Sequence, residues 1–273
     1  MNVVASHPPR MTRPMLHIGP GLRLPPEAVT ETFAIVAKRG VGKTYTAAVM
    51  VEEMVKAALP VVVVDPIGVW WGLRSSADGK GPGLAVTILG GEHGDLPLEE
   101  GAGAVVADFL VDRPAPLVVD VSGFRKGPAR RFMTDFLEQL YARNRSPLHV
   151  VLDEADEWVP QRPLKGSERL LGACEDLVRR GRARGLGCTL ITQRPAVRHK
   201  DVLTQAEVLV ALRIIGPQDR NAHRRVDQGA RHPGGAGPAA RLAGQASRGQ
   251  LVVVVARVAR RVRPGEGSPA GDV

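Results

Sequence analysis

The stretch that most constrains the fold is FAIVAKRGVGKTYTAAVM, which runs from Phe33 to Met50. It begins with an apolar run of strand length, continues through a glycine-containing turn that ends in Gly-Lys-Thr, and passes into a helical pattern. A strand, a glycine loop and a helix in this order are the context that makes a phosphate-binding loop credible. The alternative is an ordinary glycine turn with an exposed lysine, and the flanking patterns disfavour it.

The loop AKRGVGKT has the Walker A spacing, except that Ala37 stands where the pattern has its first glycine. Alanine is tolerated there if its φ stays negative. We expect Lys43 to reach the β and γ phosphates of ATP and the Thr44 hydroxyl to bind Mg²⁺. With the backbone N–H groups that would cradle the phosphates, the predicted nucleotide-binding set is Lys38, Arg39, Gly40, Val41, Gly42, Lys43, Thr44 and Tyr45.

Apolar runs of strand length recur along the chain, at residues 32–36, 61–65, 84–89, 116–121, 149–153, 188–192 and 208–212. Helical patterns lie between most of them and are clearest at 44–57, 128–144 and 168–184. Continuous apolar strands that alternate with helices predict a doubly wound α/β fold, with a mostly parallel sheet covered by helices on both faces. Ligands of such sheets bind at the carboxyl ends of the strands.

A second motif, LHVVLDEADEW, places Asp153 and Glu154 at the end of a buried strand. Asp153 is predicted to hold Mg²⁺, usually through water, and Glu154 to polarise an attacking water. A kinase that transfers phosphate to a hydroxyl would not need that glutamate. The alternative is a strand end that happens to be acidic, and Asp156 and Glu157 are interpreted as a solvated turn.

The third motif is LVRRGRARGLGCTLITQRPA, in which a basic helix is followed by a strand with Gln193 at its tip. The amide of Gln193 could sense the γ-phosphate or orient the attacking water. One arginine of the helix could act as an arginine finger on a neighbouring subunit's nucleotide, or these arginines could form a solvated face. The candidates are Arg179, Arg180, Arg182 and Arg184.

The loop VVVVDPIGVWWGLR leaves several alternatives open. Asp65 could belong to the metal shell, hold Lys43, or cap the loop. Trp70 and Trp71 could stack on a base or a partner, but packing in the core or an interface is favoured.

Together these motifs and VLVALRIIGPQDRN resemble the bacterial and phage ATP-binding proteins of the HerA/FtsK class, close to the HerA central-domain family, over about residues 16–221. The resemblance implies a RecA-like P-loop NTPase that uses ATP and Mg²⁺. It also implies a homo-oligomer, commonly a hexameric ring that moves DNA and can work with a partner nuclease or a phage or mobile-element protein. It favours Arg182 as the finger. The sequence departs from the class at Ala37, and at Ile67 and Val69 in the DPIGVWWG loop.

Two rival functions remain. A DEAD-box helicase shares a P-loop and the letters DEAD at residues 153–156, but it needs a second RecA-like domain, for which we expect this chain to be too short. It also needs a Ser-Ala-Thr motif after the DEAD strand, whereas the next strand here ends in ITQ. A nucleotide-dependent switch or assembly scaffold would bind ATP, hydrolyse it slowly and move nothing. Loss of the catalytic acid would mark such a switch, and Glu154 is present.

Composition divides the chain of 273 residues into a Pro-rich N-terminal segment (1–28), one P-loop ATPase domain (29–220) and a basic tail (221–273). The only cysteines are Cys174 and Cys188, without CxxC or metal-ligand spacing, which suits a reduced cytoplasmic protein. Neither a secretory signal nor a membrane anchor is evident.

The amino-acid composition of the tail differs from that of the rest of the chain. Arg, Gly, Ala and Pro supply 32 of its 53 residues, and Phe, Trp and Tyr are absent, so we expect it to be disordered. Because the resemblance stops abruptly near Asn221, we hypothesise that the tail is read in a shifted frame. A basic arm that binds DNA phosphates is the alternative.

Overall fold

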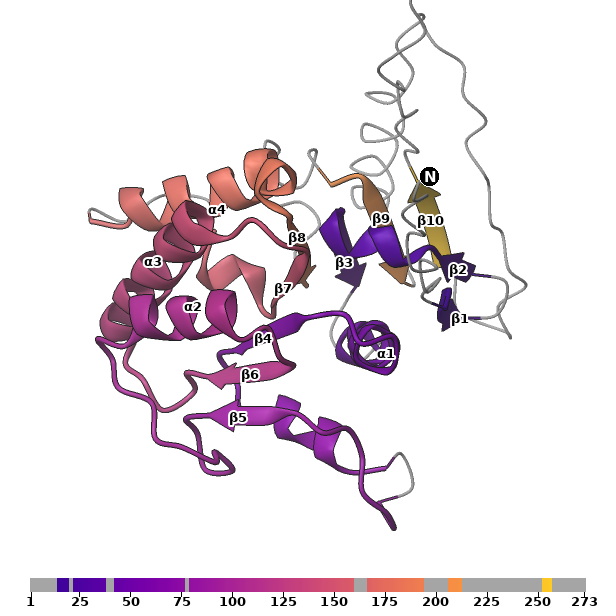
Figure 1. Cartoon of the computed structure of the whole chain (residues 1–273), viewed down its shortest axis with the longest axis horizontal. Helices are drawn as coiled ribbons and strands as arrows, with labels where there is room; N and C mark the ends of the chain where they lie inside the picture. The colour runs from indigo at the N-terminus through magenta and orange to yellow at the C-terminus, as the bar shows by residue number, and fades with distance from the viewer. Residues whose placement is uncertain are drawn as a thin grey trace, which may run out of the picture.

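A single large sheet organises the structure, a computed structural model that describes residues 14–19, 22–37, 42–76, 79–159, 166–193, 206–212 and 252–256 (Figure 1). Its eight strands follow the order β10-β9-β3-β8-β7-β4-β6-β5. All neighbours pair in parallel except β10, which runs antiparallel to β9. The strands are β3 (Thr32–Ala37), β4 (Val61–Asp65), β5 (Thr87–Leu89), β6 (Leu117–Asp120), β7 (Leu148–Leu152), β8 (Leu186–Thr192), β9 (Val208–Leu212) and β10 (Val252–Ala256).

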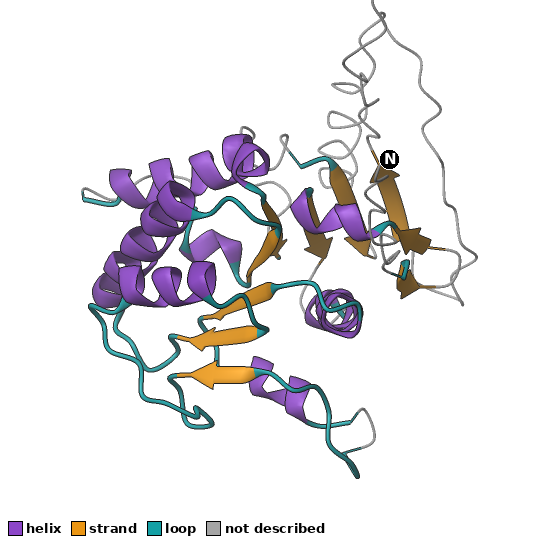
Figure 2. Cartoon of the chain, in the orientation of Figure 1, coloured by secondary structure: helices purple, strands orange, loops and turns teal. Residues whose placement is uncertain are grey.

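Helices cover both faces of this sheet (Figure 2). On one face lies α1 (Lys43–Lys56), and on the other lie α2 (Gly103–Asp112), α3 (Lys126–Arg143) and α4 (Glu168–Arg180). Strand β4 shows why its sequence is continuously apolar: Val61 and Val63 join the core beneath α1, whereas Val62 and Val64 join the core beneath α2, α3 and α4. The predicted α/β fold, a mostly parallel sheet with helices on both faces, is confirmed.

The element ends differ slightly from the sequence pattern. Helix α3 begins at Lys126, two residues before the expected position, and α4 ends at Arg180, where a 3-10 turn, η4 (Gly181–Arg184), replaces the last predicted turn. Other 3-10 turns are η1 (Pro26–Thr30), η2 (Trp70–Arg74) and η3 (Ala155–Glu157). Among the described residues, no helix is both long and apolar enough to cross a membrane.

The Pro-rich N-terminal segment (1–28), which we predicted to be separate from the P-loop domain, contributes to the main core. It holds a hairpin of β1 (Leu16–Gly19) and β2 (Leu22–Leu24). Leu16 is buried in the cluster beneath α1, and the backbone N–H of His17 donates to Glu53 on that helix at 2.9 Å. Residues 16–24 are therefore structurally continuous with the P-loop domain.

The predicted disordered tail needs a correction at five residues. Val252–Ala256 form β10, which pairs with β9 along its whole length. Valine is a strong strand former, and the edge of β9 offers backbone groups that need hydrogen-bond partners. The rest of 221–273 lies outside the described residues, so the frame-shift hypothesis stays a prediction.

Candidate nucleotide-binding and hydrolysis site

The predicted site residues follow neighbouring parallel strands. β3, β8, β7 and β4 are consecutive in the sheet, so the residues after their carboxyl ends meet at one edge. Gly42 and Lys43 follow β3, Asp153 and Glu154 follow β7, and Gln193 follows β8. Segments far apart in sequence are thereby brought together.

Within the P-loop, the structure describes Ala37 and the residues from Gly42 onward, whereas Lys38, Arg39, Gly40 and Val41 lie outside the described residues. Gly42 has a φ of +89° and immediately precedes α1, a left-handed conformation that glycine adopts without steric cost. Thr44 is partly buried, whereas Tyr45 is 73% exposed on the first turn of α1.

Lys43 is buried against the acidic end of β7. Burial lowers the pKa of its ammonium group, while the nearby charges of Glu154, Asp153 and Asp156 act in the opposite direction. An ammonium group in this position, beside a helix N-terminus, can bind a polyphosphate by electrostatic attraction.

Asp153 is 2% exposed, and hydrogen bonds fix it from several sides. Its Oδ2 accepts the indole N–H of Trp70 at 2.8 Å, and its Oδ1 accepts the backbone N–H of Glu154 at 2.8 Å. Its main-chain carbonyl accepts the indole N–H of Trp158 at 3.0 Å. Burial raises the pKa of the Asp153 carboxyl, and the bonds from Trp70 and Glu154 oppose that shift.

Glu154 has an uncommon backbone conformation. Its φ is +41° and its ψ is 57°, in the left-handed region that non-glycine residues rarely adopt. Strained backbone of this kind concentrates at functional sites, where the surrounding structure holds it in place. The Glu154 carboxylate accepts a hydrogen bond from the Gln193 side-chain amide.

The acidic turn after Glu154 is more ordered than expected from the sequence. The hydroxyl of Thr192, at the end of β8, donates to Asp156 at 2.7 Å. Lys126, on the first turn of α3, pairs with Glu157 at 3.4 Å. Each acid therefore has a side-chain partner from another element, while the side chain of Glu157 is still 42% exposed to solvent.

Asp65 acts as a loop cap, which resolves the alternatives left open for it. Its carboxylate accepts four backbone N–H groups, those of Ile67, Gly68, Val69 and Trp70, at 2.6–2.9 Å. The two tryptophans that follow differ: Trp70 is buried, whereas Trp71 is 40% exposed and lies against the His93 ring, with centroids 4.1 Å apart.

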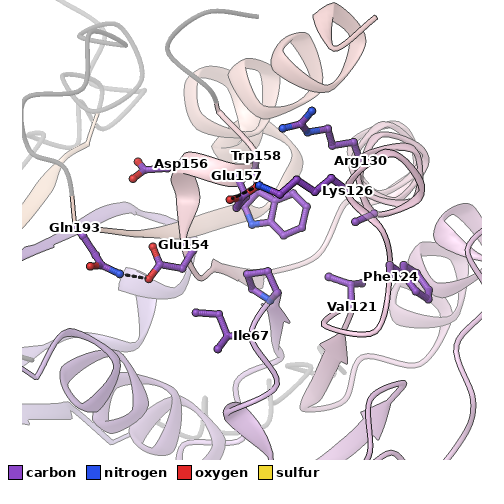
Figure 3. A pocket seen from close by; sticks show the side chains of 12 residues that line it. Ile67, Val121, Phe124, Lys126, Arg130, Glu154, Asp156, Glu157, Trp158 and Gln193 are labelled. Atoms are coloured by element: carbon purple, nitrogen blue, oxygen red, sulfur yellow. Dashed lines mark hydrogen bonds and ion pairs between the residues drawn. The ribbon is translucent and has the colours of Figure 1, made fainter. Parts of the chain in front are cut away.

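A cavity of about 460 Å³ adjoins these residues (Figure 3). Its walls combine apolar side chains, such as Ile67, Phe124 and Trp158, with the polar groups of Glu154 and Gln193. In Figure 3, Glu154 and Gln193 point toward each other, and Lys126 reaches Glu157. The predicted water-polarising residue therefore faces open volume.

The oxygen ligands of Asp153 and Thr44 fit a Mg²⁺ ion that binds together with a nucleotide. Within the described ranges there is no cluster of three or more His, Cys, Asp or Glu side chains that could hold a metal ion. Each Asp153 oxygen accepts one N–H and keeps a further lone pair, and Thr44 adds a hydroxyl. Magnesium typically binds one or two protein oxygens together with waters and substrate phosphates. Asp153 and Thr44 can supply the protein oxygens.

Arg182 lies away from this site. It precedes β8, so it sits at the amino ends of the strands, and the seven residues of β8 separate it from Gln193 by roughly 20 Å. Its guanidinium pairs with Glu31 at 3.0 Å and with Glu207 at 3.1 Å. Within one chain Arg182 therefore does not reach Lys43 or Glu154.

Sequence comparison extends the motif-based resemblance. Residues 21–76 match the family model described as the central domain of helicase HerA. The DNA double-strand break repair helicase HerA of Pyrococcus furiosus is 28% identical over 102 residues, which are 37% of this chain and 18% of that protein. The probable HerA of Methanocaldococcus jannaschii is 29% identical over 94 residues, 34% of this chain and 18% of that protein. The resemblance to HerA is confirmed.

The match to HerA covers the P-loop, α1, β4 and the loop that Asp65 caps, but this chain spans under a fifth of each curated relative. Among solved structures, the genome packaging NTPase B204 of Sulfolobus turreted icosahedral virus 2 has a TM-score of 0.49 and 13% identity, covering 74% of this chain and 84% of B204. The pCW3 conjugation coupling protein TcpA has a TM-score of 0.43 and 15% identity, covering 74% and 53%.

Sequence reasoning missed Trp70 and Trp158 as neighbours of the acidic strand end. Trp70 stands 83 positions from the aspartate that it contacts, so no local spacing could reveal the pair. The one available signal was the buried position expected for a tryptophan next to a core strand, because a buried indole N–H usually finds an acceptor.

Proposed function

We propose that this protein binds ATP with Mg²⁺ and hydrolyses it, as a motor of the HerA/FtsK type that works on DNA. The single observation that carries the proposal is the arrangement of Lys43, Asp153, Glu154 and Gln193 at one edge of the sheet. A P-loop lysine, a strand-end aspartate and an adjoining glutamate are the parts that phosphoryl transfer to water requires.

Each residue has a separate chemical task. Lys43 binds the terminal phosphates, and Glu154 accepts the proton of the attacking water. Gln193 keeps the Glu154 carboxylate in place. Mg²⁺ bound with the nucleotide, near Thr44 and Asp153, supplies charge neutralisation of the phosphates.

Three parts of this proposal rest on the resemblance to HerA: DNA as the substrate, a ring of subunits and a cytoplasmic site of action. The two HerA relatives of this chain are named for DNA double-strand break repair. Turnover of ATP measured with and without double-stranded DNA, across protein concentration, tests this proposal. A ring motor gives DNA-stimulated turnover that rises more than linearly with concentration. If ATP turnover depends neither on DNA nor on protein concentration, the motor proposal is rejected.

The alternative is an ATP-dependent switch or scaffold with slow hydrolysis, in which the hydrogen bond between Gln193 and Glu154 would restrain the glutamate instead of orienting it. If that bond restrains the glutamate, ATP would persist in the site and report a state rather than drive movement. Tight ATP binding with slow, DNA-independent turnover would support the switch.

A further inference from the structure

Two buried residues that follow different strands meet beside the proposed nucleotide site. Trp70 follows β4 and Asp153 follows β7, and each is 2% exposed. The indole N–H of Trp70 donates to the carboxylate of Asp153 at 2.8 Å, a bond between a neutral donor and a carboxylate that is sheltered from water. Hydrogen bonds to charged groups contribute more than neutral ones.

The backbone that carries Trp70 is itself fixed. Asp65 receives the N–H groups of the four residues that lead into and include Trp70. Gly68, within this loop, has a φ of +82°, and a Cβ added there would lie 2.8 Å from the Ser122 hydroxyl oxygen. The loop is therefore held between β4 and the residues after β6. These contacts fix the backbone that positions the Trp70 indole next to Asp153.

We propose that Trp70 is a positioning residue for Asp153, whose carboxylate plane it fixes in the orientation that takes up Mg²⁺ with the nucleotide. This inference rests on the proposed function. A carboxylate can rotate about its Cβ–Cγ bond, but here the indole N–H holds one oxygen and the Glu154 N–H holds the other. The remaining lone pairs then point in defined directions, which lowers the cost of assembling the metal site.

Trp158 provides an internal control for packing. It is as buried as Trp70 and also donates an indole N–H to Asp153, but to the main-chain carbonyl at 3.0 Å rather than to the carboxylate. Substituting either indole by phenyl removes similar volume and one hydrogen bond. Only the change at Trp70 removes a donor to the carboxylate, which then keeps the backbone N–H of Glu154 alone.

The experiment compares Trp70→Phe with Trp158→Phe and with Trp71→Phe, a change at the exposed tryptophan. In Trp70→Phe the Mg²⁺ concentration for half-maximal ATP hydrolysis is expected to rise about tenfold, the size expected for losing one hydrogen bond to a carboxylate. Binding of a fluorescent ATP analogue in EDTA should stay within about twofold of wild type. The two control variants should keep the wild-type Mg²⁺ dependence within about twofold.

A second measurement uses no turnover. The chain has three tryptophans, so ¹⁵N-labelled indoles give three N–H signals. Asp153→Asn should shift the Trp70 signal and leave the Trp71 signal unchanged, and Mg²⁺ with a non-hydrolysable ATP analogue should shift Trp70 as well. A Trp70 signal that responds to neither change overturns the inference.

The outcomes separate this inference from the proposed function. A wild-type protein that binds and hydrolyses Mg·ATP, with equal Mg²⁺ dependence in Trp70→Phe and Trp158→Phe, removes the positioning role alone. A wild-type protein that binds no Mg·ATP removes both.

Discussion

The side-chain amide of Gln193 donates a hydrogen bond to the carboxylate of Glu154, across the ends of two adjacent parallel strands. Glu154 is the residue expected to act on water, and its backbone occupies the left-handed region. We therefore propose that Gln193 orients the Glu154 carboxylate, a role that its hydrogen bond supports more directly than sensing phosphate.

Gln193→Ala should lower kcat for ATP hydrolysis about tenfold or more with little change in KM, because the glutamate loses its orienting partner. Steady-state kinetics measure both parameters. Gln139→Ala is the matched control, since that amide donates to Asp108 at 2.7 Å on the helical layer. An increase in kcat would instead show that Gln193 restrains Glu154, in favour of the switch.

Glu154→Gln should leave ATP binding intact and reduce hydrolysis by about a hundredfold or more, because the base acts in the chemical step and not in the ground state. Equilibrium binding of a fluorescent ATP analogue and single-turnover hydrolysis separate the two effects. Equal loss of ATP affinity and rate would remove Glu154 from the base role.

Lys43→Ala should abolish nucleotide binding, because its ammonium group offsets phosphate charge before any reaction occurs. Calorimetric titration with ATP measures the loss. Lys56→Ala removes a lysine at the other end of α1, where it pairs with Glu52 and Glu53, and should bind ATP normally. Normal binding by Lys43→Ala would contradict the P-loop interpretation.

Arg182 can contact a nucleotide only from a neighbouring subunit, because its own site lies at the other edge of the sheet. If it acts in trans, mixing Arg182→Ala with Lys43→Ala subunits should recover part of the activity, since an intact P-loop can then meet an intact finger. Arg180→Ala, which removes an exposed arginine paired with Asp176, should retain activity alone. Mixed assemblies that form but stay inactive would assign Arg182 to its ion pairs.

Stability should fall as the pH decreases from about 7 to 5, in part because of His149. Its ring is fully buried, bonded to the Val29 carbonyl and the Thr189 hydroxyl, and burial lowers its pKa to about 4. Below the unfolded pKa of about 6.5 the unfolded chain takes up a proton that the folded chain resists. The full effect, reached near pH 4, is on the order of 3 kcal/mol.

Urea unfolding across this pH range measures the effect. His149→Gln has a lower stability but should show a flatter dependence on pH, because the amide does not titrate. His93→Gln, at an exposed position, should keep the wild-type slope. Parallel slopes in wild type and His149→Gln would mean that other groups cause the acid sensitivity.

The sequence by itself determined the fold class and the phosphate-binding context. Apolar runs such as 61–65 are buried on both faces, and the GKT turn leads directly into α1, because strand length, hydrophobic continuity and glycine geometry are local properties of the chain. The acidic end of β7 was likewise readable from two adjacent residues.

Only the tertiary structure decided which side chains meet. The order β3-β8-β7-β4 arises from crossovers that no local pattern encodes, and it places Gln193 against Glu154 and Trp70 against Asp153. The same packing commits Asp65 to backbone N–H groups and puts Arg182 at the edge opposite Lys43. Side-chain partners depend on distances between strands that are remote in sequence, so they follow from the assembled sheet and not from spacing along the chain.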